Sequence, residues 1–482
     1  MEREPESKPL RARAVEGGIY LATRRVASMM LSLLGAILVT RIVGAGNYGL
    51  YNAAYGIFNF FLSVGLMGTS VYLIRSARDA PISLFHLAFW WLLGFGIAIA
   101  VVVGSTIAVV GHYWFRTEGF VPIALALCAN IPLTLVSYVP LALLERRLDY
   151  RKTTTIEVTS QVVNYIFTIP LAWQGYGAWA LVAGFWASQL VLPLGFFWMA
   201  RYRPRWYWDT GELRGMLRYS FSQAASGWVY NLRNLAPSMV VLPLAGQEAV
   251  GYLALAQRFL NYVSFLKGPA GRLSIPLFAR LQHDSPRLVR AVNEAMQLQT
   301  LALLPFFAGF AALAPYLLPY LLGAKWDTDM LLMVFTINGT RMLLSALFAI
   351  QGSALFVIKK NWLMFKANIA YALLFFPLAY IGMLLAPKEY RLFVFNLADL
   401  VAHFPTYWYK HWGMRQYLGR VDYRITSLWT VGGTAAIFAP WLGWWLYGVT
   451  IVLMAHPASF RQLRELYHLF LVQRTGKRAS PE

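Results

Sequence analysis

Five basic side chains lie inside long apolar stretches of the sequence, where lipid-facing positions do not tolerate charge. They are Arg233, Arg258, Lys267, Arg341 and Lys366, and all of them follow residue 205. A charged side chain at the centre of a membrane helix costs roughly 2.5–3.5 kcal/mol, so these residues are expected to face water, an acid or an anionic ligand. For the three arginines, which lie deepest, lining a cavity and pairing with an acid stay open as alternatives. The two lysines lie close enough to the inner interface to extend into it.

Acidic side chains are few in the same apolar stretches and comprise Glu157, Glu294 and Asp399. His403 follows Asp399 by four residues, so the two share a helix face and form either a protonatable pair or a structural hydrogen bond. Asp399, His403 and Glu157 are the candidates for binding a coupling proton or Na⁺, although such coupling is only what the family resemblance described below implies, and no other cofactor is predicted. Five basic residues against three acidic ones leave a net charge of +2 in these stretches. That sign suits an anionic ligand better than an organic cation.

The composition is that of a polytopic membrane protein. Of 482 residues, 58% are hydrophobic and 13% are charged, and the mean hydropathy is +0.51. A membrane-spanning helix needs about 20 apolar residues. Such segments are predicted at 17–41, 48–74, 84–111, 119–144, 155–173, 177–200, 216–243, 248–270, 292–322, 328–357, 362–386, 392–409, 425–438 and 441–456. The single cysteine, Cys128, excludes an intrachain disulfide and is expected to serve in packing.

These segments predict an all-α integral membrane protein with about fourteen transmembrane helices. We expect two pseudo-symmetric six-helix lobes, the N-lobe at 17–205 and the C-lobe at 206–420, followed by a helix pair at 421–456. Twelve helices with a re-entrant pair is the alternative count. Residues 1–16 are expected to form a cytoplasmic tail. Residues 457–482 are expected to form an amphipathic tail on the cytoplasmic surface.

The loops divide the basic residues into two unequal groups. With the N-terminus in the cytoplasm, 32 of the 42 Lys and Arg residues fall in cytoplasmic segments. The opposite side carries only Arg41, Arg116, Lys325, Lys388 and Arg391. This bias follows the positive-inside rule and predicts that both termini are cytoplasmic. The net charge of +21 therefore needs no nucleic-acid partner.

Part of the sequence repeats at a constant offset of 202 residues. Four positions of the first predicted hairpin recur: Gly44 as Gly246, Gly49 as Gly251, Ala54 as Ala256 and Asn59 as Asn261. The offset corresponds to an even number of helices. It therefore predicts parallel repeats related by an axis along the membrane normal, which is the plan of a two-lobed transporter.

The first predicted hairpin also carries a recognisable pattern, in which one helix ends in R-x-x-G and the next begins with Y-G-x-Y. Arg41 and Gly44 supply the first part, and Tyr48, Gly49 and Tyr51 supply the second. The hairpin resembles that of the bacterial polysaccharide-transporter branch of the multidrug/oligosaccharidyl-lipid/polysaccharide exporter superfamily. Residues 175–181 also look like the G-x-G-x-W-A-L turn between helices five and six of that branch.

The resemblance implies a lipid-linked oligosaccharide (O-antigen) flippase in the bacterial cytoplasmic (inner) membrane. It implies two lobes around a central cavity, alternating access, and a polyprenyl-diphosphate-linked oligosaccharide that moves from the cytoplasmic to the outer leaflet. Arg233, Arg258, Arg341, Lys267 and Lys366 are then the candidates for binding the diphosphate. Guanidinium groups can replace the water that a diphosphate loses in about 30 Å of hydrocarbon. Replacing Arg258 or Arg341 by Ala is expected to abolish flipping without loss of folded protein.

Polar side chains within the predicted helices are candidates for hydrogen bonding to sugar hydroxyls. They are Gln161, Asn164, Asn231, Asn234 and Asn261, with Gln351 as a further candidate. Hydrogen bonding between helices is the commoner use of such residues and stays the alternative for each. Membrane lipids and polysaccharide-assembly proteins are the other expected partners, and the chain is expected to be a monomer. No catalytic residue and no metal site are predicted.

Other functions stay open as alternatives. Gly35 stands where related lipid II flippases carry an arginine, which disfavours a peptidoglycan precursor as the ligand. A drug exporter for organic cations would need an acidic cavity. A membrane-embedded polysaccharide polymerase or glycosyltransferase resembles chains with a long or acidic outer loop, whereas the first outer loop, 42–47, contains no acid. The sequence also has no H-E-x-x-H, no G-x-S-x-G and no phosphate-binding glycine loop.

Overall fold

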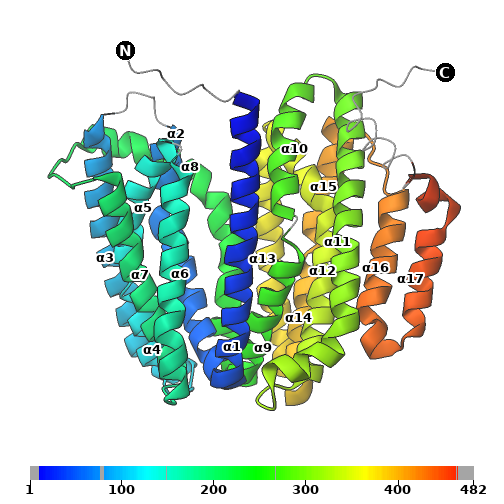
Figure 1. Ribbon diagram of the computed structural model, residues 1–482, viewed down its shortest axis with the longest axis horizontal. Coiled ribbons are helices and arrows are strands. Elements are labelled where there is room, and N and C mark those ends of the chain that lie inside the picture. Colours follow the sequence, from blue (N-terminus) through cyan, green and yellow to red (C-terminus); the bar gives the residue numbers. More distant parts are fainter. Residues whose placement is uncertain (1–9, 76–80, 148, 266, 463, 465–482) are drawn as a thin grey trace.

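The computed structural model describes residues 10–75, 81–147, 149–265, 267–462 and 464. Every secondary-structure element in these ranges is a helix, so the prediction of an all-α protein is confirmed. The helices stand side by side along a common direction (Figure 1). Most of the predicted tail at 457–482 and the first nine residues lie outside the described residues.

The N-lobe contains seven helices. In chain order they are α1 (Leu10–Leu66), α2 (Thr69–Arg75), α3 (Ile82–Trp114), α4 (Phe120–Cys128), α5 (Ile131–Arg146), α6 (Tyr150–Trp173) and α7 (Ala178–Ala200). The segment predicted at 17–41 and most of that predicted at 48–74 are joined in α1, and the end of the second segment falls in α2. The segment predicted at 119–144 is divided between α4 and α5.

The C-lobe begins with α8 (Thr210–Asn231), a 3-10 turn η1 (Leu232–Leu235) and a π turn η2 (Pro237–Val241), which lead into α9 (Leu242–Val263). It continues with α10 (Lys267–Leu281), α11 (Ser285–Leu322), α12 (Thr328–Val357), α13 (Asn361–Leu385), η3 (Lys388–Tyr390), α14 (Arg391–Ala402) and α15 (Phe404–Tyr417). The final pair is α16 (Arg424–Leu442) and α17 (Trp445–Ala455), which lie together at one edge (Figure 1).

Each predicted apolar segment falls on one or more of these helices. Within the described residues, nine helices are long and apolar enough to cross a membrane by themselves, some of them covering two predicted segments. The helix α6 is not one of the nine, because polar residues interrupt its apolar surface. The number of fourteen crossings stays a prediction.

Two glycines bend the chain in the same way in both lobes. Gly44 interrupts α1 with φ 79° and ψ 170°, and Gly246 interrupts α9 with φ 86° and ψ 176°. A positive φ of this kind is readily adopted only by glycine. Since the two positions are separated by 202 residues, the repeat seen in the sequence is also a repeat of backbone conformation.

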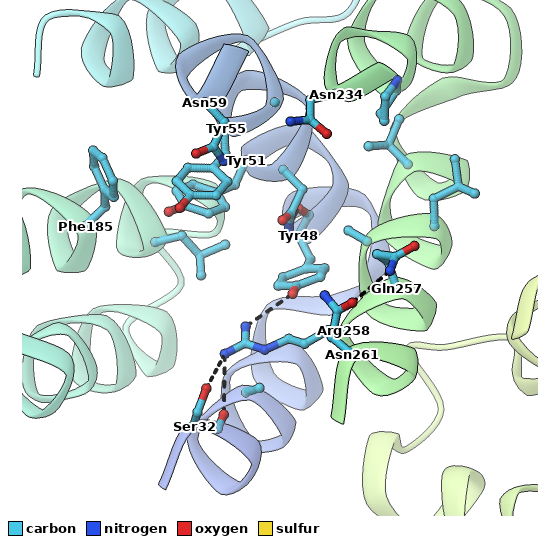
Figure 2. A pocket seen from close by; sticks show the side chains of 18 of the residues that line it. Ser32, Tyr48, Tyr51, Tyr55, Asn59, Phe185, Asn234, Gln257, Arg258 and Asn261 are labelled. Atoms are coloured by element: carbon cyan, nitrogen blue, oxygen red, sulfur yellow. Dashed lines mark hydrogen bonds between the residues drawn. The ribbon is translucent and has the colours of Figure 1, made fainter. Parts of the chain in front are cut away.

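The bends bring α1 and α9 together and leave a cavity between the lobes (Figure 2). A Cβ atom added at Gly49 would overlap the carbonyl oxygen of Gln247, and one added at Gly251 would overlap the carbonyl oxygen of Ala45. The offset of 202 relates these two contacts to each other. The lobes therefore meet around a pseudo-two-fold axis, as expected for parallel repeats.

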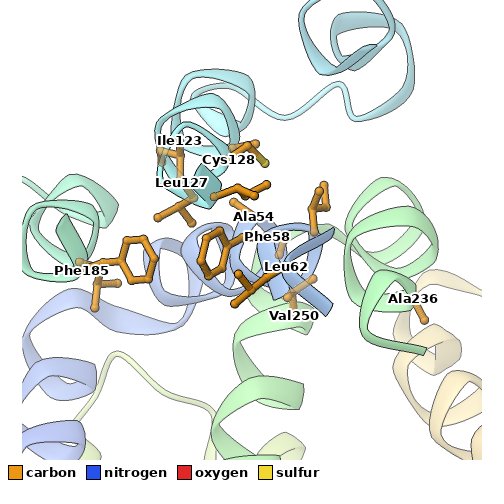
Figure 3. Close-up of a cluster of buried hydrophobic side chains, with 14 of the residues drawn as sticks. Ala54, Phe58, Leu62, Ile123, Leu127, Cys128, Phe185, Ala236 and Val250 are labelled. Atoms are coloured by element: carbon orange, nitrogen blue, oxygen red, sulfur yellow. The ribbon is translucent and has the colours of Figure 1, made fainter. Parts of the chain in front are cut away.

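A cluster of buried apolar side chains includes residues of both lobes (Figure 3). Phe58 of α1 packs edge-on against Phe185 of α7, with ring centroids 5.1 Å apart. Leu127 and Cys128 of α4 are buried in the same cluster. The expectation that Cys128 serves in packing is in agreement with this burial.

Candidate functional site

A cavity of about 790 Å³ lies between the two lobes. Its volume falls within the range of roughly 300–1,000 Å³ that is typical of ligand sites. Segments of α1, α6 and α7 form the N-lobe wall, and η1, α9, α12, α13 and α14 form the C-lobe wall. The charged residues that line it are Arg233, Arg258, Arg341 and Asp399. The described lining residues thus carry three positive charges and one negative charge, a net charge of +2.

Arg258 extends from α9 across the lobe interface (Figure 2). Its Nη2 donates to the hydroxyl of Tyr165 at 3.1 Å and to the carbonyl and hydroxyl oxygens of Ser32, both at 3.4 Å. Its Nη1 donates to the hydroxyl of Tyr48 at 3.4 Å, and its Nε donates to the hydroxyl of Tyr262 at 3.3 Å. All of these partners in the described part of the chain are neutral, and three of the four residues belong to the N-lobe.

The repeat places a glycine in the N-lobe where the C-lobe has this cation. Gly56 of α1 is the residue equivalent to Arg258, because the two differ by the offset of 202. A Cβ atom at Gly56 would lie 2.5 Å from the backbone oxygen of Asn234, so this position of the N-lobe has no room for a side chain. Both positions line the cavity, but only the one in the C-lobe carries a side chain.

Arg233 lies in η1, where the chain changes from α-helical to 3-10 and then π-helical geometry. Its guanidinium group stacks on the ring of Tyr230 at 4.4 Å from the centroid. The side chain lines the cavity and is partly buried. Arg233 is therefore the second cation that an anion in the cavity can reach.

Arg341 lines the same cavity but pairs with an acid. Its Nε lies 3.0 Å from Oδ2 of Asp399, and both side chains are largely buried, with 7% and 14% exposed. Oδ1 of Asp399 accepts a hydrogen bond from the hydroxyl of Tyr371 at 2.7 Å. Nδ1 of His403 lies 3.3 Å from the same oxygen. Arg341 therefore both lines the cavity and pairs with an acid, which are the two alternatives that the sequence leaves open.

Three other charged residues, Lys366, Glu157 and Glu294, are not among the residues that line the cavity. Lys366 is exposed and its ammonium group lies 4.4 Å from the ring centroid of Trp362. Glu157 is exposed on α6, and Glu294 is exposed on α11. Lys267 is the first residue of α10, but its side chain lies outside the described part of the structure.

Four of the five predicted sugar-contacting residues line the cavity: Gln161, Asn164, Asn234 and Asn261. Asn231 instead lines an adjoining cavity of about 350 Å³, where its side-chain amide donates to the hydroxyl of Ser63 at 2.8 Å. Gln351 is buried and donates to the hydroxyl of Tyr423 at 2.8 Å, so it links helices.

A polar stripe on α1, which the sequence analysis does not predict as part of the site, forms much of the N-lobe wall. Its members are Tyr48, Tyr51, Asn52, Tyr55 and Asn59, all of which line the cavity. They recur at spacings of three and four residues, which places them on one helix face. A stripe of this kind on an otherwise apolar membrane helix is a signal that the sequence already contains.

The lobes are also joined where α1 bends. The bend at Gly44 leaves backbone carbonyl groups without their helical partners. The indole Nε1 of Trp326 donates to the carbonyl of Thr40 at 2.9 Å, and Nζ of Lys325 donates to that of Ile42 at 2.6 Å. At the equivalent bend in α9, Nη1 of Arg391 donates to the carbonyl of Leu244 at 2.5 Å. Basic groups are thus placed at both of these helix ends, where the helix dipole favours them.

Comparison with known proteins identifies the family. Residues 38–331, more than half of the chain, match the model of a family described as polysaccharide biosynthesis protein. The chain belongs to this polysaccharide biosynthesis protein family.

Two curated proteins illustrate the similarity. The succinoglycan biosynthesis transport protein ExoT of Rhizobium meliloti is 26% identical over 63% of this chain and 63% of its own length, which is less than two thirds of that protein. The lipopolysaccharide biosynthesis protein WzxC of Escherichia coli is 22% identical over 77% of this chain and 76% of its own length.

Solved structures share the fold of this polysaccharide biosynthesis protein. The lipid II flippase MurJ in an inward closed conformation has a TM-score of 0.70 and 14% identity, over 94% of this chain and all of MurJ. An inward-facing multidrug resistance MATE family transporter of the MOP superfamily has a TM-score of 0.63 and 15% identity, over 81% of this chain and 94% of its own. The predicted all-α fold is confirmed. ExoT is named a transport protein and MurJ a flippase, which agrees with the prediction of a transporter rather than an enzyme.

Proposed function

We propose that this protein flips a polyprenyl-diphosphate-linked oligosaccharide from the cytoplasmic to the outer leaflet of the bacterial inner membrane by alternating access. Its fold, shared with MurJ and a MATE transporter, and its family support this assignment. The saccharide and the diphosphate would occupy the cavity between the lobes, while the polyprenyl chain stays in the lipid. The basic bias of the predicted cytoplasmic loops supports an orientation with both termini in the cytoplasm.

The observation that carries the proposal is the set of neutral hydrogen-bond partners around Arg258 in the cavity. Its guanidinium group lines the cavity and is held by hydroxyl and carbonyl groups, without a carboxylate among its recorded partners in the described ranges. Hydrogen bonds between arginine and phosphate are bidentate, charge-assisted and roughly twice as strong as neutral ones. A diphosphate can therefore displace these neutral partners, whereas an organic cation would be repelled by the cavity charge of +2.

Arg233 is the second diphosphate ligand in this proposal, because it also lines the cavity and stacks on a neutral ring. Arg341 contributes less, because Asp399 already compensates its charge. Asp399 is the one acid among the described lining residues, so it and the adjacent His403 are the groups that we assign to proton or Na⁺ coupling, if transport uses an ion. The protein would act as a monomer that exchanges its ligand with polysaccharide-assembly proteins.

A reconstituted transport assay tests the proposal. Purified protein is placed in liposomes that carry a polyprenyl-diphosphate-linked saccharide in both leaflets, and the saccharide exposed outside is removed with a glycosidase. The wild-type protein is expected to make nearly all of the labelled lipid accessible, while protein-free liposomes protect about half of it. A wild-type protein that binds and moves none of these lipids would contradict the proposed function.

A further inference from the structure

The two walls of the cavity differ in charge. The N-lobe wall, formed by α1, α6 and α7, contains no Asp, Glu, Lys or Arg among its described lining residues. All four charged lining residues, Arg233, Arg258, Arg341 and Asp399, belong to the C-lobe wall. A ligand with one ionic group and one neutral group would therefore meet two different surfaces.

The N-lobe wall contains a group of aromatic side chains that line the cavity. The rings of Tyr51 and Tyr55 are stacked, with centroids 5.8 Å apart and an interplanar angle of 13°. Phe185 of α7 meets Tyr55 edge-on at 5.9 Å. Figure 2 shows this aromatic group on one side of the cavity, while Arg258 extends from the opposite helix. The three rings line the cavity as well as packing against each other.

Neutral hydrogen-bonding groups surround these rings. They are the amides of Asn52, Asn59, Gln161, Asn164 and Gln189 and the hydroxyl of Ser188. An amide offers both donors and acceptors, as a sugar hydroxyl does. The apolar C–H face of a sugar ring packs well on an aromatic face, which combines a large apolar surface with few rotatable bonds. The N-lobe wall thus has the chemistry of a carbohydrate-binding surface.

We propose that the N-lobe wall binds the sugars nearest to the diphosphate, while the C-lobe wall binds the diphosphate itself. This inference rests on the proposed function and adds an orientation to it. Tyr51 and Tyr55 are its specificity-determining residues, because they provide the stacked platform. The ligand then lies across the lobe interface, with its ionic part beside the guanidinium of Arg258 and its neutral part beside Tyr51 and Tyr55.

The charge difference makes the opposite orientation unfavourable. Beside Tyr51 and Tyr55, a diphosphate would be removed from water at a wall that supplies no cation of its own. Sugars against Arg258 and Arg233 would leave guanidinium groups without an anionic partner. Each part of the ligand therefore has one wall that matches it.

Binding measurements on two probes test this assignment. The probes are polyprenyl diphosphate without sugar and polyprenyl-diphosphate-linked glucose, both added to the full-length protein in detergent. The double variant Tyr51→Leu/Tyr55→Leu is expected to bind the sugar-free probe within about twofold of wild type, and the glucosylated probe about tenfold more weakly. Arg258→Ala is expected to weaken both probes by the same factor. Phe60→Leu, on the same helix but outside the cavity lining, is the matched control and should bind both probes as wild type does.

The outcomes separate this inference from the proposed function. A wild-type protein that binds neither probe would contradict the proposed function and with it the inference. A wild-type protein that binds both probes equally well, or a double variant that weakens both equally, would overturn the inference alone. If the double variant does not fold, Asn59→Leu replaces it, since this change removes an amide of the same wall and keeps the branching and the number of side-chain heavy atoms. The same selective loss of the glucosylated probe is then expected.

Discussion

Gly49 and Gly251 face each other across the lobe interface so closely that neither position can hold a side chain. A Cβ atom at Gly49 would lie 2.6 Å from the backbone nitrogen of Gly251, and one at Gly251 would overlap the carbonyl of Ala45. The residues are separated by the repeat offset, so each lobe contributes the same contact to the other. This part of the interface is therefore a backbone-to-backbone contact that depends on two glycines.

The first prediction concerns this contact. Replacing Gly49 by Ala forces backbone atoms apart, because no flexible side chain can yield. Overpacking of this kind costs about 1–3 kcal/mol, which is enough to shift the population toward a conformation with separated lobes by about tenfold. The measurement is a spin-label distance between Tyr176→Cys of the N-lobe and Tyr390→Cys of the C-lobe, both exposed, in a Cys128→Ser background. The distance is expected to increase.

Gly309→Ala is the matched control, because a Cβ atom there would meet nothing within 4 Å. The distance between the two spin labels in this variant should be distributed as in the labelled protein that keeps both Gly49 and Gly309. An unchanged distribution in a folded Gly49→Ala variant would show that this contact does not hold the lobes together.

The second prediction concerns Arg258. Arg258→Ala is expected to reduce flipping at least about tenfold, because the ligand loses a charge-assisted bidentate partner worth more than a neutral hydrogen bond. Arg258→Lys retains the charge but not the planar fork, so it should recover part of the activity. Both variants are compared with wild type in the liposome assay at equal protein content.

Lys366→Ala provides the control for Arg258. Like Arg258, Lys366 is a candidate for binding the diphosphate in the sequence, but it is exposed and stacks on Trp362. Flipping by this variant should remain within about twofold of wild type. Equal losses in Lys366→Ala and Arg258→Ala would mean that the activity depends on total charge and not on the cavity.

The third prediction concerns the buried ion pair of Arg341 and Asp399. Removing one partner of such a pair costs about 3–5 kcal/mol, because the other charge stays buried without compensation. Arg341→Leu and Asp399→Leu are therefore each expected to lower the midpoint of thermal unfolding, followed by tryptophan fluorescence. The double variant should recover most of the loss, since replacing both partners by apolar groups is often neutral. Single variants as stable as wild type would show that the pair contributes no stability.

This ion pair is also an example of a contact that the sequence does not predict. The helices, the repeat and the unusual position of the three arginines follow from hydropathy and spacing, which are local properties. The partner of Arg341 lies 58 residues away in Asp399, and only packing of α12 against α14 brings them together. The sequence therefore led to the expectation that Arg341→Ala leaves a folded protein, whereas the ion pair predicts a less stable one.

The residues of the cavity wall could be predicted from the sequence only in part. Asn164 and Asn261 were predicted because single polar residues in apolar helices are conspicuous. Tyr51 and Tyr55 were missed, since tyrosine is common in membrane helices and its role depends on which face of α1 borders the cavity. The bend at Gly44 sets that face, and a bend angle is not encoded in hydropathy.

The fourth prediction concerns the bend in α1. Trp326 donates its indole N–H to the carbonyl of Thr40 at 2.9 Å, and it is 5% exposed. Trp326→Phe keeps most of the ring but leaves this buried carbonyl with one partner fewer, which is expected to lower the free energy of unfolding by about 1–3 kcal/mol. Trp198→Phe, at a side chain that is 77% exposed, is the control and should change it little. Urea or thermal unfolding of the purified protein measures the difference, and equal stability of the two variants would mean that the hydrogen bond to Thr40 does not stabilise the bend.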